Sequence, residues 1–371
     1  MYQGRKLHFI SMDVPFPPNY GGVIDVFYKL KAFHQLGVEI YLHLFGFNET
    51  ESDVLRKYAK EVYFYPIDQK PYYIFQKYPI SVKSRDSKLL YERIKSLKAP
   101  IFFESLKTTF ILNKYNLEGY SKYLRLHNIE QNYFSGLAES EKNLVKKALF
   151  YIEAKKYIQY ENIIHQFDEV FTLSKFEQNY IQEKYNKGKF VPVFHGNETF
   201  ESLSEKGEFA LYHGDLRASD NCKVVDFLIE VFKVIDYPFV IASGSRENWV
   251  KAKIKNHPHI QFVKLKDFNH LKNLFEKAHL NIAWSFQESG TKLKVINALF
   301  NSRFSIINEN VIDDEKISGL CVQVSNKSEL IKAINHLKNQ SFLASKEYID
   351  TLEYDLNDKL NAEIILKQIF N

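Results

Sequence analysis

The chain has 371 residues, of which 45% are hydrophobic and 26% charged, and its formal net charge is +5. This length exceeds what one hydrophobic core usually organises, so two domains are expected. The composition excludes extended disorder, which requires a smaller apolar fraction. Lysines are spread along the chain without an arginine-rich arm or zinc-finger spacing, so nucleic acid is not expected as a partner.

The two cysteines, Cys222 and Cys321, have no cluster of histidine or cysteine beside them, which disfavours a disulfide framework and a zinc site. The first residues are polar and lead directly into an apolar run, so no signal peptide is expected. No uninterrupted apolar stretch approaches the length of a membrane span. We therefore expect a cytoplasmic protein, and any contact with the inner face of the membrane would be peripheral.

Short apolar runs alternate with amphipathic stretches through the first half, which is typical of βα units in a parallel sheet. The predicted strands are Lys6–Met12, Glu39–Phe45, Glu61–Pro66, Ile101–Glu104, Tyr123–Leu126 and Glu169–Leu173. Val26, Leu30 and Phe33 fall on one face of a helix predicted over Val23–Leu36, and Gly37 follows as its C-terminal stop.

The polar, irregular stretch His195–Gly207 indicates a connection between domains. A second βα series follows, with predicted strands at Phe209–His213, Phe239–Ser243, Ile260–Leu265, Leu280–Phe286, Phe304–Ile307 and Cys321–Val324. Apolar residues at helical spacing then predict a closing helix over Lys346–Asn371. The expected organisation is an N-terminal domain over 1–196, a C-terminal domain over 197–345 and a closing helix over 346–371 that packs back toward the N-terminal domain.

The strongest local signal lies between the strand that ends near Phe286 and a helix predicted over Val295–Phe300. It reads Glu288-Ser289-Gly290-Thr291-Lys292-Leu293-Lys294. Small residues there let backbone N–H groups face a ligand, the helix N-terminus adds positive potential, and two lysines add charge, as diphosphate binding requires. An ordinary strand-to-helix turn with a Ser or Thr cap explains the same residue types equally well.

A glycine pair, Gly21-Gly22, follows the first strand and opens the first helix, where parallel sheets bind ligands. Asp13 before it and Asp25 after it could position a hydroxyl group or accept a proton. The alternative is a tight turn after a proline-rich loop.

His127, at the end of another predicted strand, could hydrogen-bond a sugar hydroxyl, although a lone histidine is more often structural. Gly214 with Arg217, and Gly244 with Arg246, follow two strands of the second series and favour a phosphate-bearing ligand. No metal-binding, P-loop or nucleophile-elbow motif is found. The basic helix-like stretch Lys142–Ile164 could touch anionic lipid or could be a solvated helix packed on its domain.

Five motifs together resemble the bacterial family 4 glycosyltransferases across nearly the whole chain. They are Pro-Phe-Pro-Pro-Asn-Tyr-Gly-Gly at 15–22, Arg-Leu-His-Asn-Ile-Glu at 125–130, Thr-Leu-Ser-Lys at 172–175, His-Gly-Asp-Leu at 213–216 and Ser-Gly-Thr-Lys-Leu-Lys at 289–294. The resemblance implies an α/β GT-B fold, with two Rossmann-like, doubly wound parallel-sheet domains that face a cleft. It also implies a nucleotide-sugar substrate, retention of anomeric configuration and no required metal or other cofactor.

The resemblance further implies roles for individual residues. In the first half, the loop of Gly21 and Gly22 would approach the donor diphosphate and the acceptor, and His127 would face the transferring sugar. In the second half, the nucleotide site would be lined by Gly214 and Gly244, and the donor sugar would be bound by Glu288. Phosphate would be bound through the backbone amides of Ser289, Gly290 and Thr291. Asn297 stands where the family usually has a ribose-binding Glu, and Asp215 where it has a basic residue. Arg217, Lys292 or Lys294 would then supply the missing positive charge.

The sequence thus predicts a hexosyltransferase with an N-terminal acceptor domain and a C-terminal donor domain. The acceptor implied by the resemblance is a glycan or a lipid-linked glycan of a bacterial cell-envelope polysaccharide. Two alternatives stay open at this point. One is a non-catalytic protein of the same fold that binds a sugar nucleotide or glycan, and the other is a GT-B-shaped nucleotide-sugar epimerase.

Overall fold

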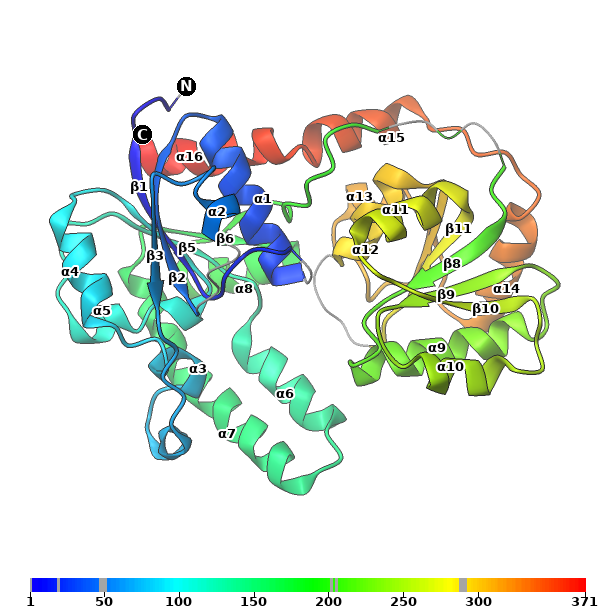
Figure 1. Ribbon diagram of the computed structural model, residues 1–371, viewed down its shortest axis with the longest axis horizontal. Helices are drawn as coiled ribbons and strands as arrows, with labels where there is room; N and C mark the ends of the chain where they lie inside the picture. Colours follow the sequence, from blue (N-terminus) through cyan, green and yellow to red (C-terminus); the bar gives the residue numbers. More distant parts are fainter. Residues whose placement is uncertain (1, 19–20, 47–51, 201–202, 204–205, 287–291) are drawn as a thin grey trace. The chain divides into compact units, whose positions relative to one another are not determined.

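The computed structural model describes residues 2–18, 21–46, 52–200, 203, 206–286 and 292–371 (Figure 1). The chain forms two compact units. The first contains Met1–Gly196 together with Asp358–Asn371, and the second contains Asn197–Asn357. No helix among the described residues is both long enough and apolar enough to cross a membrane.

The first unit is built on a seven-stranded parallel sheet with the order β3-β2-β1-β4-β5-β6-β7. The strands are β1 (Lys6–Ser11), β2 (Glu39–Phe45), β3 (Glu61–Tyr65), β4 (Ile101–Glu104), β5 (Lys122–Arg125), β6 (Glu169–Thr172) and β7 (Lys189–Phe190). Six of them match the predicted runs to within one residue at each end. The strand β7 escaped prediction because two residues at a sheet edge carry no periodic pattern.

The helices of the first unit connect these strands on both faces of the sheet. They are α1 (Gly21–Gln35), α2 (Ser52–Leu55), η2 (Pro71–Phe75), α3 (Ile80–Lys83), α4 (Lys88–Ser96), η3 (Leu106–Thr108), α5 (Ile111–Lys114), α6 (Glu130–Ser140), α7 (Leu144–Tyr160), η4 (Glu161–Gln166), α8 (Lys175–Tyr185) and α16 (Asp358–Phe370). Gly37, just beyond α1, has φ of +90° and confirms the predicted stop.

Successive residues of each strand point to opposite faces of this sheet and pack in two separate apolar cores. Ile10 of β1 packs in the core that includes Tyr157 of α7, whereas its neighbour Phe9 packs with Leu30 of α1. Ile365 of α16 belongs to the second core, so the C-terminal helix packs beside α1 on one face of the sheet (Figure 1). Burial on both faces explains why these strands are continuous apolar runs.

The segment predicted as one closing helix is interrupted. It consists of α15 (Lys346–Asp350), the π-helical turn η5 (Thr351–Asp355) and, after a break at Leu356 and Asn357, the helix α16. The carboxylate of Asp358 accepts hydrogen bonds from the backbone N–H groups of His195 and Gly196, at 3.2 and 2.8 Å. These hydrogen bonds hold the start of α16 next to His195 and Gly196.

The second unit repeats the architecture with a six-stranded parallel sheet of order β10-β9-β8-β11-β12-β13. Its strands are β8 (Phe209–His213), β9 (Phe239–Ser243), β10 (Ile260–Lys264), β11 (Ala278–Ala283), β12 (Phe304–Ile307) and β13 (Val322–Gln323). Its other helices are α9 (Ser219–Phe232), α10 (Glu247–Ile254), α11 (Phe268–Lys277), α12 (Leu293–Asn301), α13 (Glu315–Gly319) and α14 (Lys327–Leu337). The two parallel, doubly wound sheets confirm the predicted fold class.

One predicted strand ends early. The run Leu280–Phe286 was expected to be strand throughout, but β11 ends at Ala283. The reason is a clamp on Ser285, whose backbone N–H donates to Asn308 Oδ1 at 3.1 Å and whose carbonyl accepts from Asn308 Nδ2 at 2.8 Å. A side-chain clamp replaces the ladder hydrogen bonds that a longer strand would make.

Each sheet has a switch point, where the strand order reverses direction. It lies between β1 and β4 in the first unit and between β8 and β11 in the second. The loops after two such strands run to opposite sides and leave a crevice at their carboxyl ends, where open parallel sheets bind ligands. A functional site is therefore expected at the switch point of each sheet.

Candidate functional site

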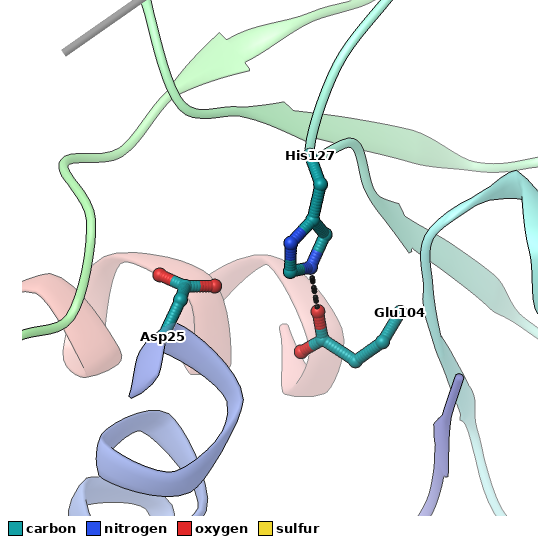
Figure 2. Close-up of side chains that lie close together, drawn as sticks. All are labelled: Asp25, Glu104 and His127. Carbon is teal, nitrogen blue, oxygen red and sulfur yellow. Dashed lines mark hydrogen bonds and ion pairs between the residues drawn. The ribbon is translucent and has the colours of Figure 1, made fainter. Parts of the chain in front are cut away.

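At the switch point of the first unit, three potential ligand groups converge from three elements (Figure 2). Asp25 lies in α1, Glu104 is the last residue of β4, and His127 lies two residues after β5. One polar atom from each is within 4.8 Å of the others. His127 Nε2 faces Glu104 Oε2 at 2.8 Å. Because a carboxylate oxygen only accepts, the imidazole donates through Nε2, and its Nδ1 points away from Glu104.

A lysine lies between the two carboxylates. Lys29, one turn after Asp25 on α1, donates from Nζ to Asp25 Oδ2 and to Glu104 Oε1, each at 2.6 Å. All three side chains are buried. The ammonium group occupies the position that a metal ion bound by these carboxylates would take, so this set of residues does not fit a metal site.

Asp25 is held by further contacts on its other oxygen. Its Oδ1 accepts from Arg125 Nη2 at 3.2 Å and from the backbone N–H of Phe194 at 2.8 Å. Burial by itself would raise the pKa of the Asp25 carboxyl, but the charges of Lys29 and Arg125 outweigh burial and hold that pKa below its usual value. Asp25 is therefore a charged anchor within what we call the acid–lysine cluster (Asp25, Lys29, Glu104, Arg125 and His127).

At the switch point of the second unit lies a pocket of about 270 Å³, which we call the β8–β11 pocket. Its lining comes from the carboxyl ends of β8 and β11 and from the first turns of α9 and α12. The lining residues are His213, Gly214, Asp215, Asp220, Asn221, Trp284, Ser285, Lys292, Leu293 and Lys294. Its volume approaches the lower end of the ~300–1,000 Å³ typical of small-molecule sites.

Burial shapes the charges around this pocket. Burial, together with the nearby charge of Lys292, lowers the pKa of Lys294 to about 8. Burial also lowers the pKa of Lys292, against the opposing effect of Asp220. The pKa of His213 falls to about 3 for the same reason, with Lys294 contributing, so this imidazole is neutral at neutral pH. An anion in the pocket would compensate both partly desolvated ammonium groups.

Polar atoms around the pocket lack protein partners within the described part of the chain. They are His213 Nε2, Asp220 Oδ1 and the indole nitrogen of Trp284, all buried. At the starts of α9 and α12, the N-cap residues Ala218 and Lys292 form no side-chain cap hydrogen bond in the described part of the chain. Buried polar groups and helix N-termini normally find partners, so the lining favours a polar ligand with an anionic part.

Three residues predicted to bind the donor line the β8–β11 pocket: Gly214, Lys292 and Lys294. Arg217 is not among the lining residues. Its guanidinium pairs with the carboxylate of Asp215, with Nε at 3.0 Å from Oδ1 and Nη2 at 2.8 Å from Oδ2. Asn297 lies further along α12, where its Oδ1 accepts from Asn197 Nδ2 at 3.0 Å. Each side chain therefore already has a protein partner.

The remaining predicted residues are placed as follows. Gly244 directly follows β9 and does not line the pocket. Gly21 and Gly22 form the first turn of α1, and a Cβ added at Gly21 would meet no atom within 4 Å. Asp13 lies two residues after β1, where its backbone N–H donates a hydrogen bond to Ser11 Oγ and its carbonyl accepts one from the same hydroxyl group. Glu288, Ser289, Gly290 and Thr291 lie outside the described residues.

Sequence reasoning missed Lys29, Glu104 and Asp220. The available signal for Glu104 was an acidic residue that ends an otherwise apolar predicted strand. Lys29 follows Asp25 at the spacing of a helical ion pair, a pattern that is common on solvated helix faces. Asp220 carried no signal, since acidic residues are frequent in the first turn of any helix.

Together, two doubly wound parallel sheets and the C-terminal helix packed beside α1 define the GT-B glycosyltransferase fold. The solved structure of S. aureus TarM, in complex with fondaparinux, alpha-GlcNAc-glycerol and UDP, aligns with a TM-score of 0.66 at 11% identity and covers 99% of this chain and 100% of TarM. WaaG, a glycosyltransferase involved in lipopolysaccharide biosynthesis, aligns with a TM-score of 0.65 at 12% identity, covering 98% and 100% of the two chains.

Sequence comparison adds a relative without an assigned activity. An uncharacterized 44.6 kDa protein in the cps region of Klebsiella pneumoniae is 24% identical over 326 residues, which is 81% of this chain and 82% of the relative. No protein-family model matches the chain.

Proposed function

We propose that the protein is a glycosyltransferase that takes a nucleotide-diphosphate sugar as its donor. The observation that carries the proposal is the β8–β11 pocket. Two helix N-termini and two lysines of lowered pKa surround it, at the switch point of a doubly wound sheet. Main-chain N–H groups and partly buried ammonium groups together match a diphosphate better than they match a neutral sugar.

In this proposal the diphosphate binds beside Lys292 and Lys294 at the start of α12. As the bond between the sugar and the diphosphate breaks, negative charge grows on the leaving oxygen. Preorganised positive charge at that position stabilises the transition state without a metal ion. Asp220, whose Oδ1 has no protein partner among the described residues, is proposed to accept a hydrogen bond from a donor hydroxyl group.

The first unit is proposed to serve the acceptor side of the reaction and the transferring sugar. Glu104 fixes the ring of His127 by accepting from Nε2 at 2.8 Å, and Lys29 in turn fixes Glu104. The imidazole is thereby oriented so that Nδ1 can bond a sugar hydroxyl. We assign Lys29 and Glu104 as positioning residues and His127 as the group that contacts sugar.

Within this proposal, the donor carries a hexose, and the acceptor is a glycan or lipid-linked glycan of a cell-envelope polysaccharide. This assignment is supported by the cps-region relative from K. pneumoniae and by the likeness to WaaG, a glycosyltransferase involved in lipopolysaccharide biosynthesis. UDP sugars are the first donors to test because the TarM complex contains UDP.

Incubation of the full chain with a panel of UDP and GDP sugars, with and without lipid-linked glycans, tests the proposal. The expected result is acceptor-dependent release of the nucleoside diphosphate by the wild type and strongly reduced release by Lys292→Ala. Lys251→Ala, which removes an exposed lysine of α10 paired with Glu247, is the matched control and should behave as the wild type.

Two results would replace the proposal. Tight nucleotide-sugar binding without release for any acceptor would support a non-catalytic binding protein. Conversion of the donor sugar into its epimer, without transfer, would support an epimerase.

A further inference from the structure

The helix α7 exposes apolar side chains on its solvent face as well as on its packed face. Its inner side contributes Tyr157 and Tyr160 to the core of the first unit. Leu144 and Val145, in its first turn, are 80% and 70% exposed, and Ile158 in its last turn is 54% exposed. Leu149, Tyr151 and Ile152 are also exposed between them. Apolar side chains exposed in this number on one helix normally contact protein or lipid.

Most of the exposed residues of α7 lie along one stripe of the helix, and Val145, Leu149 and Ile152 lie on its flank. Leu144, Ala148, Tyr151, Lys155 and Ile158 recur at the three- and four-residue spacing that places them on one side of a helix. The opposite side packs against α6, where Phe134 stacks on Tyr157 with ring centroids 5.4 Å apart. We call the solvent side, with Val145, Leu149 and Ile152 included, the α7 outer face. The α6–α7 hairpin extends away from the sheet of the first unit (Figure 1).

Lysines surround this face. Lys142, Lys146 and Lys155 are exposed, and Lys147 is partly exposed. The acidic residues of the same stretch are fewer. Glu139 and Glu141 lie at the α6 end of the hairpin. Glu153 is buried, where it pairs with Lys156 at 2.9 Å and accepts from the backbone of Ile80. The outer face and its rim therefore carry an excess of positive charge.

An exposed aromatic residue lies in η2, a short helix that contacts α7. Lys156 of α7 donates to the carbonyl of Tyr73 in the short helix η2, at 3.2 Å. The last residue of η2, Phe75, is 90% exposed, and Lys77 follows two residues later. An aromatic side chain with an adjacent lysine is typical of the boundary between lipid headgroups and acyl chains.

We propose that the α7 outer face binds peripherally to an anionic lipid surface. Leu144 and Val145 would enter the headgroup region, while the lysines would pair with lipid phosphates. A second copy of the chain is a poorer partner, because it would bring two lysine-rich faces together in like-charge repulsion. No residue of this surface belongs to the acid–lysine cluster or lines the β8–β11 pocket, and vesicle binding requires no sugar transfer. Its failure and the failure of the proposed enzyme function are thus distinguishable.

Sedimentation of the full chain with vesicles tests the inference. The chain should bind vesicles that mix phosphatidylcholine with phosphatidylglycerol, should bind phosphatidylcholine alone weakly, and should lose affinity as salt rises. The double variant Leu144→Ser/Val145→Ser should reduce binding to background. Lys146→Gln/Lys147→Gln should weaken it by roughly fivefold for each lysine removed.

The matched control is Val234→Ser, which removes a valine of the second unit that is 67% exposed, close to the exposure of Val145. Unchanged thermal unfolding of every variant excludes a folding defect. The inference is overturned if the chain does not bind anionic vesicles, or if Leu144→Ser/Val145→Ser binds them as the wild type does. It is equally overturned if that variant only converts a dimer into a monomer, because the face would then be an interface between copies.

Discussion

Replacement of Lys294 by methionine should raise stability and weaken nucleotide binding at the same time. Among the described residues, its ammonium group makes one long contact of 3.4 Å to the carbonyl of Trp284 and lies 5.2 Å from the ring centroid of Tyr212. Burial lowers its pKa from 10.5 to about 8. At about 1.4 kcal/mol per pKa unit, the charge costs the folded state up to about 3 kcal/mol. Partial exposure to solvent reduces this figure, so we expect a gain of about 1–3 kcal/mol in the Lys294→Met variant.

The sign of the pH dependence follows from the direction of the shift. The folded pKa lies below that of the unfolded chain, so the cost is fully present below about pH 8 and disappears as the pH rises toward 10.5. Lys294→Met should therefore melt roughly 3–10 °C higher than the wild type at pH 7, and the difference should narrow at pH 10. Loss of one charge-assisted contact should weaken UDP binding by about 1.5–3 kcal/mol, which is roughly 10- to 150-fold in Kd.

Differential scanning calorimetry without ligand and titration calorimetry with UDP measure the two effects. Lys251→Met is the matched control, because Lys251 is exposed and pairs with Glu247 at 2.8 Å, and it should change neither quantity much. A Lys294→Met variant that melts lower than the wild type refutes the reasoning about burial. A variant that binds UDP as tightly as the wild type refutes the assignment of the pocket.

Four further outcomes are expected. Affinity of the wild type for UDP should fall above about pH 8, because bound diphosphate raises the pKa of Lys294. The Lys294→Met variant should lose this pH dependence, and an equal dependence in both proteins contradicts the assignment of the pocket. Asp25→Asn should lower the free energy of unfolding in urea by about 3–5 kcal/mol, since Lys29 loses a buried partner at 2.6 Å, and a loss below about 1 kcal/mol contradicts this role. Burial lowers the pKa of His8 and of His43, so the folded state favours the neutral imidazoles, and the free energy of unfolding should decrease as the pH falls below about 6.5. Equal melting temperatures at pH 7.5 and pH 5 would show that the two rings do not contribute to the pH dependence of stability. Transferase activity should survive an excess of chelator, and loss of activity that added magnesium restores would refute the proposal that lysines replace a metal.

Every strand of the two sheets except β7 could be predicted because parallel strands covered on two faces are short, continuous apolar runs. Glu39–Phe45 and Phe239–Ser243 were predicted at their observed bounds. Prediction failed where tertiary contacts set the end of an element. The end of β11 depends on Asn308, which lies 23 residues after Ser285, and the break before α16 coincides with the anchoring of Asp358 by the distant His195.

The candidate site was predictable only in part, for a related reason. His127 follows the end of β5, and Lys294 lies in the first turn of α12, the helix after β11. Strand ends and the helix starts that follow them are where parallel sheets bind ligands. The pairing of Lys29 with Glu104 joins residues 75 positions apart, and no local pattern distinguishes it from a solvated lysine. Arg217 was expected to contribute charge, but the neighbouring Asp215 already pairs with it. Local sequence shows which residues are present, whereas the partner of each charge is set by the fold.

The central claim is that the β8–β11 pocket holds the diphosphate of a sugar nucleotide. A crystal structure of the full chain with UDP tests it most directly. The account predicts that the diphosphate lies within hydrogen-bonding distance of Lys292 or Lys294 and of the first N–H groups of α12. Well-defined UDP at any other place on the chain, with this pocket holding only water, would contradict it.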